Sequence, residues 1–311
     1  MRSILITGAG GAGAELIWKL FSDKYSLFFA DADLARISRD IPDTRCVKIP
    51  FAGDDDFLQE LVSVCLKLDI DLLVSAVDEE LSFLAENVGL FSGTRMFMPE
   101  ASFIRMMLDK FQMVEHFKAN ALMPITKLLS DHTVDIPFPS ILKPRTGRGS
   151  RDVFVLDNDD DLDYFSRKFT GRLDDFIVQE KAEGVEYTVQ VVSSSQGALH
   201  EIIPVKVFSK KGITISAETE YDQNVIAACQ RLHMLGGGSG TYNIQLILSS
   251  DGIVYPFEIN PRISTTFGLV LASGVDPFEL FDNHSATFIG RASERSGCRL
   301  ERHWVNSITH Y

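Results

Sequence analysis

GTYNIQLILSSDGIVYPFEINPR, residues 240–262, is the stretch that decides the fold. Two runs that alternate or read apolar, YNIQLIL and IVYPFEIN, flank a short loop containing Asp251-Gly252. An Asp-Gly pair tolerates the positive φ that a tight turn needs. The stretch therefore predicts an antiparallel hairpin.

The polar residues of this hairpin are candidates for a metal site. Side chains two residues apart on a strand share a face, so Asn243 and Gln245 can lie beside Glu258 and Asn260. One carboxylate with several amide oxygens suits Mg²⁺ better than Zn²⁺, which prefers His or Cys. A solvated polar face is the alternative, and composition alone favours it. The run EINPR, a polar triplet in an apolar strand closed by Pro and Arg, favours the metal site.

A second signal is PSILKPRTGRGSRDVFVL, residues 139–156. The strand-like run SILKP leads to Gly147, Gly149 and Ser150 and then to a second strand, VFVL. The glycines therefore belong to a hairpin loop, whereas a Walker P-loop opens a helix. Backbone N–H groups of such a loop can bind β- and γ-phosphates, and Lys143 offers a point charge to an α-phosphate. A purely structural glycine hairpin is the alternative.

Together, NIQLIL, FEINPRIS and the pattern K-P-R-x-G-x-G-S resemble the ATP-grasp superfamily, most of all its carbamoyl-phosphate-synthetase-like branch of carboxylate-amine ligases. The resemblance covers residues 1–290. It implies that Gln245, Glu258 and Asn260 bind Mg²⁺, with Mn²⁺ as an alternative ion, and that Arg262 contacts the transferred phosphate. The sequence departs from the family at Asp152, where Gly commonly precedes the Val. Asp tolerates the left-handed conformation, so the turn can survive.

The same resemblance implies a set of residues that bind ATP. The segment 180–182 would contact the adenine through its backbone, Glu186 the ribose, and the two lysines and the glycine loop the phosphates. The full set is Lys110, Lys143, Gly147, Gly149, Ser150, Glu180, Lys181, Ala182 and Glu186.

A further group of cations follows in HEIIPVKVFSKKGITIS, residues 200–216, which predicts two more strands. Lys206, Lys210 and Lys211 lie around the turn, and in an acidic protein such a group is a candidate anion site. Because Lys206 stands between apolar residues, we favour it as a second catalytic cation beside Arg262. A solvated turn explains Lys210 and Lys211 equally well.

The N-terminal run SILIT, a turn at Gly8–Gly13 and the helical AELIWKLF predict the first unit of a doubly wound parallel sheet. The glycine spacing, with Asp31 about 20 residues on, also fits dinucleotide binding. A tightly packed βαβ start needs the same glycines, and the ATP-grasp resemblance implies such a domain without nicotinamide. Loops after parallel strands open on the ligand side, so Thr7, Asp78 and Glu79 should face the crevice. A helix N-terminus, where acidic residues are favoured, explains Asp78 and Glu79 equally well.

The expected fold class combines α/β and α+β. A Rossmann-like, pre-ATP-grasp parallel sheet (residues 1–100) should precede a two-lobed ATP-grasp fold with antiparallel sheets. Its small lobe, residues 101–185, would carry the glycine-rich loop, and its large lobe, residues 186–311, the metal site. Apolar residues at helical spacing over 101–121 predict a packed helical segment at the start of the small lobe.

Composition limits the partners. The chain has 311 residues, 45% of them hydrophobic, and a net charge of −13 with a pI near 5.0. This balance argues against a nucleic acid or an anionic membrane as the main partner. Four scattered cysteines indicate reduced thiols and a cytoplasmic setting, and no apolar run suggests a signal peptide or membrane span. A homodimer is left open.

The expected function is an ATP-dependent ligase that activates a small-molecule carboxylate as an acyl-phosphate for attack by an amine or similar nucleophile. The substrate is expected to be amino-acid-like. One alternative is a non-catalytic ATP-binding module or sensor. A nicotinamide-binding oxidoreductase is a weaker one, since no hydride-site acid or base stands out.

The glycine hairpin predicts that the protein binds ATP with Mg²⁺ and does not bind NAD. Isothermal titration with both nucleotides measures this directly. Micromolar binding of NAD, with none for ATP, would overturn the expected fold and function together.

Overall fold

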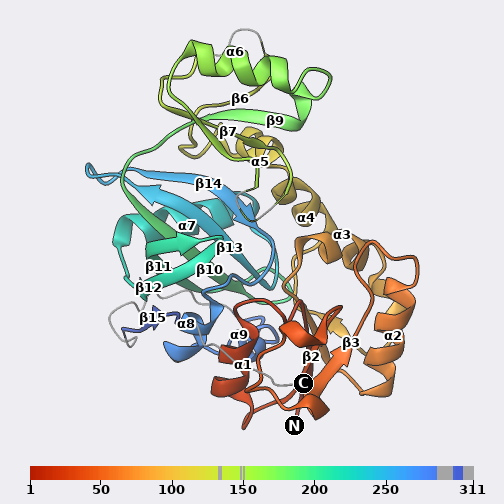
Figure 1. Cartoon of the computed structure of the whole chain (residues 1–311). Coiled ribbons are helices and arrows are strands. Elements are labelled where there is room, and N and C mark those ends of the chain that lie inside the picture. The colour runs from red at the N-terminus through yellow and green to blue at the C-terminus, as the bar shows by residue number, and fades with distance from the viewer. Residues whose placement is uncertain (132–134, 148, 150, 286–296, 304–311) are drawn as a thin grey trace.

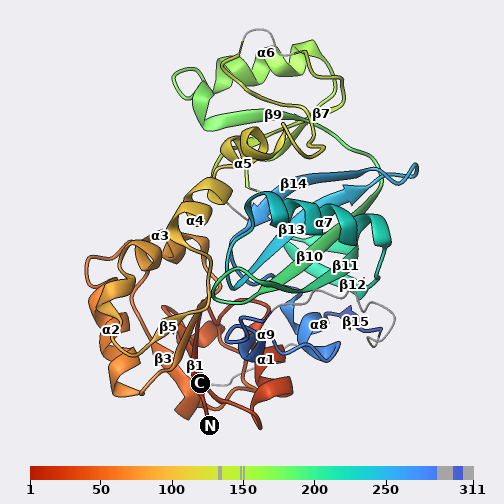
Figure 2. The ribbon, with the colours of Figure 1, turned by 180° about the vertical axis from the view of Figure 1, so that it is seen from behind.

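The structure is a computed structural model that describes residues 1–131, 135–147, 149, 151–285 and 297–303. Its described strands form a parallel sheet of five and antiparallel sheets of four and six. Figure 1 shows the five-stranded sheet at one end, the six-stranded sheet in the middle and the four-stranded sheet at the far end; Figure 2 gives the reverse view. The expected α/β and α+β class is confirmed.

The first sheet is parallel throughout and has the order β3-β2-β1-β4-β5. This is the order of a doubly wound sheet, with β1 at the centre. All five residues of β1 are buried, as expected for a parallel strand covered on both faces. In sheet order the strands span Cys46–Lys48, Ser26–Asp31, Ser3–Thr7, Leu72–Ser75 and Arg95–Met96. The accompanying helices are α1 (Ala14–Phe21), α2 (Phe57–Lys67) and α3 (Asp78–Glu86), with short 3-10 turns at Leu34–Arg36, Asp43–Arg45 and Val88–Leu90.

The glycine turn after β1 is shaped by close packing. Gly8 has a φ of +66°, and a Cβ there would lie 2.4 Å from the side chain of Val77. The Gly10 N–H donates to the carboxylate of Asp31 at 2.8 Å. Asp31, the candidate ribose ligand of the dinucleotide alternative, therefore holds the turn itself.

The helical segment over residues 101–121 is divided into two helices. α4 (Ala101–Leu108) ends at Asp109, whose backbone is extended, and α5 (Lys110–Phe117) begins directly after it. The Asp109 side chain accepts hydrogen bonds from the N–H groups of Phe111 and Gln112, which makes it the N-cap of α5. The cap places Lys110 at the first turn of a helix.

The second sheet has the order β6-β9-β7-β8, and its described pairs are antiparallel. The strands span Thr126–Leu128, Phe176–Glu180, Ser140–Pro144 and Phe154–Leu156. α6 (Asp159–Lys168) covers one face, as Figure 1 shows. Phe165 of this helix packs on Phe154, and Phe169 at its C-cap packs on Phe176. Asn158 caps α6 by accepting from the Asp161 N–H, so the acidic run at 157–163 is a helix start. A 3-10 turn at Leu173–Asp175 leads into β9.

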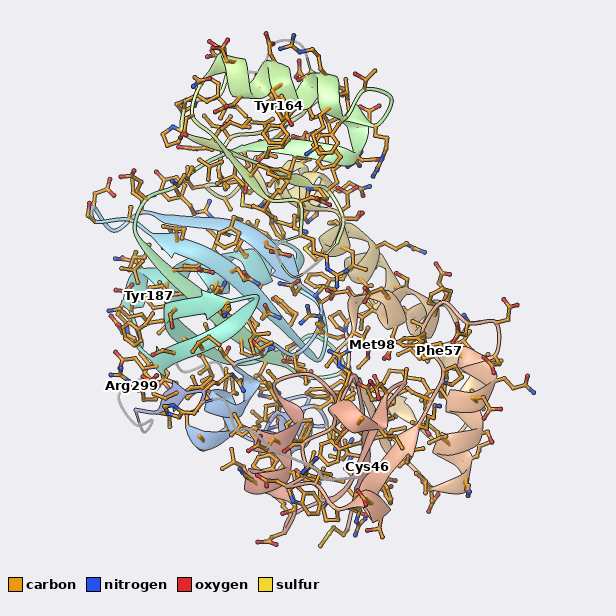
Figure 3. All side chains as sticks on the ribbon, in the orientation of Figure 1. Cys46, Phe57, Met98, Tyr164, Tyr187 and Arg299 are labelled. Carbon is orange, nitrogen blue, oxygen red and sulfur yellow. The ribbon has the colours of Figure 1, made fainter. Side chains whose placement is uncertain are left out.

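The third sheet has the order β14-β13-β10-β11-β12-β15 and is antiparallel. α7 (Gln223–Gly236) packs on it, and Figure 3 labels Tyr187 on the central strand β10. In sheet order the strands span Val254–Asn260, Thr241–Leu248, Val185–Ser193, Leu199–Lys211, Ile213–Thr219 and Arg299–Glu301.

After β14 the chain returns to the first sheet. α8 (Phe267–Ala272) and α9 (Pro277–Leu280) lie beside α1, as both views show. Phe278 is fully buried, with ring centroids 5.2 Å from Phe97 and 5.7 Å from Tyr25. The first sheet therefore shares a core with a segment far along the chain, and the division at residues 100 and 185 stays a prediction. No helix in the described ranges has both the length and the apolar content that crossing a membrane requires.

A buried carboxyl lies where β1 and β4 end. Glu80, in the first turn of α3, is 5% exposed and accepts hydrogen bonds from the hydroxyls of Thr7 and Ser75, the latter at 2.7 Å. Burial raises the pKa of Glu80 to about 7, although the two hydroxyls oppose the rise.

We expect Glu80 to make the protein less stable as pH rises. The folded state holds a proton that the unfolded state releases above its ordinary pKa of 4.5, so stability is lost between that value and about 7. The loss should be roughly 3 kcal/mol at most. Urea unfolding between pH 5 and 8 should show a flatter profile for Glu80→Gln, while Glu60→Gln, an exposed carboxylate, should keep the slope. An unchanged slope in Glu80→Gln would contradict the burial argument.

Candidate active site

The central hairpin has the register that the sequence predicts. Gln245 lies directly opposite Glu258, and Asn243 directly opposite Asn260, so all four share a face of the third sheet. A register shift at Phe257 marks a β-bulge next to Glu258. The shared face, predicted from the two-residue period, is confirmed.

The donor set on this face fits Mg²⁺. Glu258 supplies a carboxylate, Gln245 an amide, and the Asn260 amide donates to Asn243 Oδ1 at 3.3 Å. Within the described residues, no group of three or more His, Cys, Asp or Glu is placed to hold a metal ion. A set with one carboxylate and amide oxygens suits an ion that keeps several waters and takes phosphate oxygens. Gln245, Glu258 and Asn260 as the metal ligands stay a prediction.

Lys143 joins the second sheet to the hairpin. It lies on β7, is 7% exposed, and its Nζ donates to Gln179 Oε1 at 2.8 Å and to the Phe257 carbonyl at 3.3 Å. Burial lowers the pKa of Lys143 to about 8; the charge of Glu258 opposes this fall and that of Lys110 adds to it. The bulge at Phe257 is what turns its carbonyl out of the ladder toward the lysine.

Lys110 joins the glycine loop to the same hairpin. Its Nζ donates to the Gly147 carbonyl at 2.8 Å and lies 3.3 Å from Glu258 Oε1. Gly147 and Gly149 have φ values of +112° and +73°, which only glycine adopts readily. Ser150, also expected to bind phosphate, lies outside the described residues.

Asp152 takes the left-handed conformation with a φ of +53°. The loop therefore keeps a glycine-like turn at the one position where the sequence departs from the ATP-grasp pattern. The expectation that Asp would support this turn is confirmed.

Arg145 anchors the other end of this loop, a role that the sequence reasoning missed. Its guanidinium forms an ion pair with Asp109, with Nε 3.2 Å from Oδ1, and its carbonyl accepts from the Lys110 N–H at 2.9 Å. The helix cap, the loop and Lys110 are thus fixed together. The available sequence signal was Asp109, a typical helix N-cap residue directly before Lys110.

The segment expected to contact adenine follows β9. The Glu180 N–H donates to the Ile125 carbonyl at 2.8 Å, and the Glu180 carboxylate accepts from the Ile125 N–H at 3.1 Å. Lys181 is exposed and Ala182 half-buried, in the linker that leads into β10. Their role as an adenine hinge stays a prediction.

Of the three lysines around the turn between β11 and β12, Lys210 is the one described in contact with the hairpin. Its Nζ is ion-paired with Glu186 and lies 3.3 Å from Gln245 Oε1. From the sequence, a solvated turn explained Lys210 equally well, and Lys206 was favoured as the catalytic cation. Glu186, the expected ribose contact, is engaged by Lys210 in this ion pair.

Lys206 does not reach this site. It pairs with Tyr187, which in turn pairs with Leu246, whereas Gln245 pairs with Thr188, so Lys206 points from the opposite face of the sheet. Its Nζ forms an ion pair with Glu220 at 2.7 Å. Lys206 was favoured because it stands between apolar residues, and its catalytic role stays a prediction that this position does not support. Register shifts between β11 and β12 near Ser209 interrupt the alternation of faces before Lys210.

Arg262 is held by the first domain. Its guanidinium forms a two-point pair with Asp78 at the start of α3, with Nη2 2.9 Å from Oδ2, and Nη1 donates to the Ile263 carbonyl at 3.1 Å. Burial disfavours the charged guanidinium, but the Asp78 carboxylate outweighs it, so the pKa of Arg262 lies above its ordinary value. Asp78 is therefore engaged by an arginine, and its place in a substrate crevice stays a prediction.

The sequence of this chain is similar to a known protein family and to known enzymes. The family described as the ATP-grasp domain matches residues 107–266, more than half of the chain. The D-alanine–D-alanine ligase of Petrotoga mobilis is 26% identical over 210 residues, which are 58% of this chain and 69% of that protein. A similar ligase of Anaeromyxobacter dehalogenans is 26% identical over 43% of this chain and 52% of its own length.

Solved structures share the fold. An L-amino acid ligase from Bacillus licheniformis superimposes with a TM-score of 0.68 at 16% identity, over 90% of this chain and 73% of that one. The biotin carboxylase domain of a 2-oxoglutarate carboxylase from Hydrogenobacter thermophilus, solved with MgADP and bicarbonate, gives 0.67 at 16% identity, over 93% and 70%. The chain belongs to the ATP-grasp family, and the expectation from its sequence is confirmed.

The pair of Asp78 with Arg262 yields a stability prediction. Both side chains are mostly buried, at 12% and 15% exposure, so Asp78→Ala leaves an unpaired buried cation and should cost roughly 3 kcal/mol. Glu115→Ala, which breaks the exposed pair with Lys118, should cost less than about 1 kcal/mol. Urea unfolding measures both, and equal small costs would show that the pair does not stabilise the contact.

Proposed function

We propose that the protein is an ATP-dependent, ADP-forming ligase that activates a carboxylate as an acyl-phosphate for attack by an amine or similar nucleophile. The observation that carries this proposal is the meeting of Lys143, Lys110 and Glu258 where the second sheet faces the central hairpin. One cation from the glycine-loop sheet and one from the first turn of α5 thus lie beside one carboxylate, the set that a nucleotide phosphate with a divalent ion requires.

The side chains and backbone of this chain would position ATP and neutralise the charge of its phosphates. Lys143 and the backbone of the glycine loop would bind phosphate oxygens, and the first turn of α5 brings Lys110 to the same place. Gln245, Glu258 and Asn260 would hold Mg²⁺, or Mn²⁺ in its place. An ion held by these residues would supply positive charge to the phosphates of the nucleotide. Adenine would lie on Glu180–Ala182 and ribose near Glu186.

The reaction has two steps. A substrate carboxylate oxygen attacks the γ-phosphorus of ATP, the bond to the β-phosphate oxygen breaks, and ADP leaves. An amine nitrogen then attacks the acyl carbon, the carbon–oxygen bond to phosphate breaks, and the amine loses a proton. Such transfers depend on positioning and charge more than on a protein acid or base, which accords with the composition of the site.

An amino-acid-like substrate is supported by the chemistry named for the relatives, which are D-alanine and L-amino acid ligases. The crevice between the first sheet and the segment after Arg262 is where we propose that it binds. The two steps require small-molecule partners, a carboxylate and an amine. A cytoplasmic setting and a homodimer remain predictions.

A non-catalytic ATP-binding module is the second candidate, because Arg262 and Lys210 are both engaged by carboxylates of the chain itself. The two candidates differ in ADP formation. The nicotinamide alternative is weakened by Asp31, whose carboxylate accepts from the glycine turn and from the Asp33 N–H.

We expect ADP release from ATP and Mg²⁺ with at least one member of a panel of D- and L-amino acids, and Glu258→Gln to lower its rate roughly 100-fold because the only carboxylate of the metal set loses its charge. Glu218→Gln, another strand carboxylate of the same sheet, should keep the rate. A coupled ADP assay measures both. Near-normal rates in Glu258→Gln would remove the metal site; ATP binding without ADP from any substrate would favour the non-catalytic module.

A further inference from the structure

A chain of buried polar groups runs from Lys143 to the edge strand of the second sheet. Lys143 Nζ donates to Gln179 Oε1 at 2.8 Å, and Gln179 Nε2 donates to the Thr126 hydroxyl at 2.8 Å. The Thr126 hydroxyl donates to the Pro124 carbonyl at 2.9 Å. Lys143, Gln179 and Thr126 are 7%, 2% and 7% exposed, so every link is inside the lobe.

The direction of these hydrogen bonds is fixed from one end. A carbonyl only accepts, so the Thr126 proton goes to Pro124 and the Thr126 oxygen must accept from its other neighbour. Gln179 therefore turns its NH₂ toward Thr126 and its oxygen toward the ammonium of Lys143. Glutamine cannot reverse without losing both bonds, and this makes its oxygen a fixed acceptor.

The partners of Lys143 differ from those of the neighbouring lysines. Lys110 lies against Glu258 and Lys210 against Glu186, so each is partly neutralised by a carboxylate. The described hydrogen bonds of Lys143 go to an amide oxygen and a backbone carbonyl, and neither acceptor carries a formal charge. Contacts to described residues engage two of its three N–H groups, so among these residues the third is available for a ligand.

We propose that Gln179 is a positioning residue that holds the ammonium of Lys143 in place for a nucleotide phosphate. The proposal rests on the proposed function, because it concerns the same ATP site. A carboxylate at this position would pair with the lysine and compete with the phosphate. An apolar side chain would leave a buried ammonium without its main acceptor, at a cost to its orientation.

The test is a double-mutant cycle on the full chain, with Gln179→Met and Lys143→Met, alone and together. Titration with ATP and Mg²⁺ gives the affinity for the triphosphate, and titration with adenosine gives the affinity for the part that Lys143 does not contact. Gln179→Met should weaken ATP binding roughly tenfold, since it removes a hydrogen bond to a charged group, and should leave adenosine binding unchanged.

In the Lys143→Met background the second substitution should change ATP affinity by less than about twofold. Full additivity, with ATP bound by the unsubstituted protein, would overturn this role of Gln179 and leave the proposed function standing. No ATP binding by the unsubstituted protein would overturn both. Equal losses for ATP and adenosine would show a general structural effect and would overturn the proposal.

Thermal unfolding of each variant accompanies the titrations. If Gln179→Met does not fold, Thr126→Val replaces it in the cycle, because it removes the group that orients the Gln179 amide while keeping the side-chain shape. Thr126→Val should then weaken ATP binding less than Gln179→Met does. In the Lys143→Met background it should leave ATP affinity unchanged. Gln179→Glu is the charge control: its carboxylate keeps an acceptor beside Lys143, yet we expect weaker ATP binding because the ammonium is neutralised.

Discussion

The contact between the bulged edge strand β14 and two lysines of the opposite lobe is the constraint on which the site depends. The bulge at Phe257 frees a carbonyl for Lys143, and the next residue, Glu258, faces Lys110. Strand β7 and helix α5 therefore both meet β14 through hydrogen-bonded or paired charges. Such a junction is held by polar groups that a phosphate could replace, which is a property expected of a nucleotide site.

The first sheet enters the site through a different kind of contact. Arg262 follows the hairpin directly and is paired with Asp78 at the carboxyl end of the parallel sheet, while Phe278 and its neighbours are buried beneath. The carboxyl end of the parallel sheet is thus tied to the segment after β14 by the buried pair of Asp78 and Arg262, above an apolar core. This geometry gives the N-terminal domain a part in the site although it supplies no nucleotide contact in our assignment.

Local patterns predicted well wherever strand alternation was uninterrupted. The pairing of Gln245 with Glu258, the doubly wound start and the conformation of Asp152 all follow from two-residue periods, glycine spacing and backbone preference. The choice of Lys206 rested on its apolar neighbours, whereas the structure brings Lys210 to Gln245 after register shifts near Ser209, and bulges leave no clear sequence signal. The role of Gln179 could not be foreseen, since it depends on Thr126, which lies more than 50 residues away and pairs only through the sheet.

The return of α8 and α9 to the first sheet also bears on how the chain acquires its structure during synthesis. Phe97 and Tyr25 belong to the first hundred residues, yet their aromatic partner Phe278 is made near the end. A nascent chain that has emerged only as far as the parallel sheet must carry this apolar surface uncovered until residues 263–281 arrive. Closing that core is a contact of high sequence separation, which slows folding and exposes the intermediate to association with other chains.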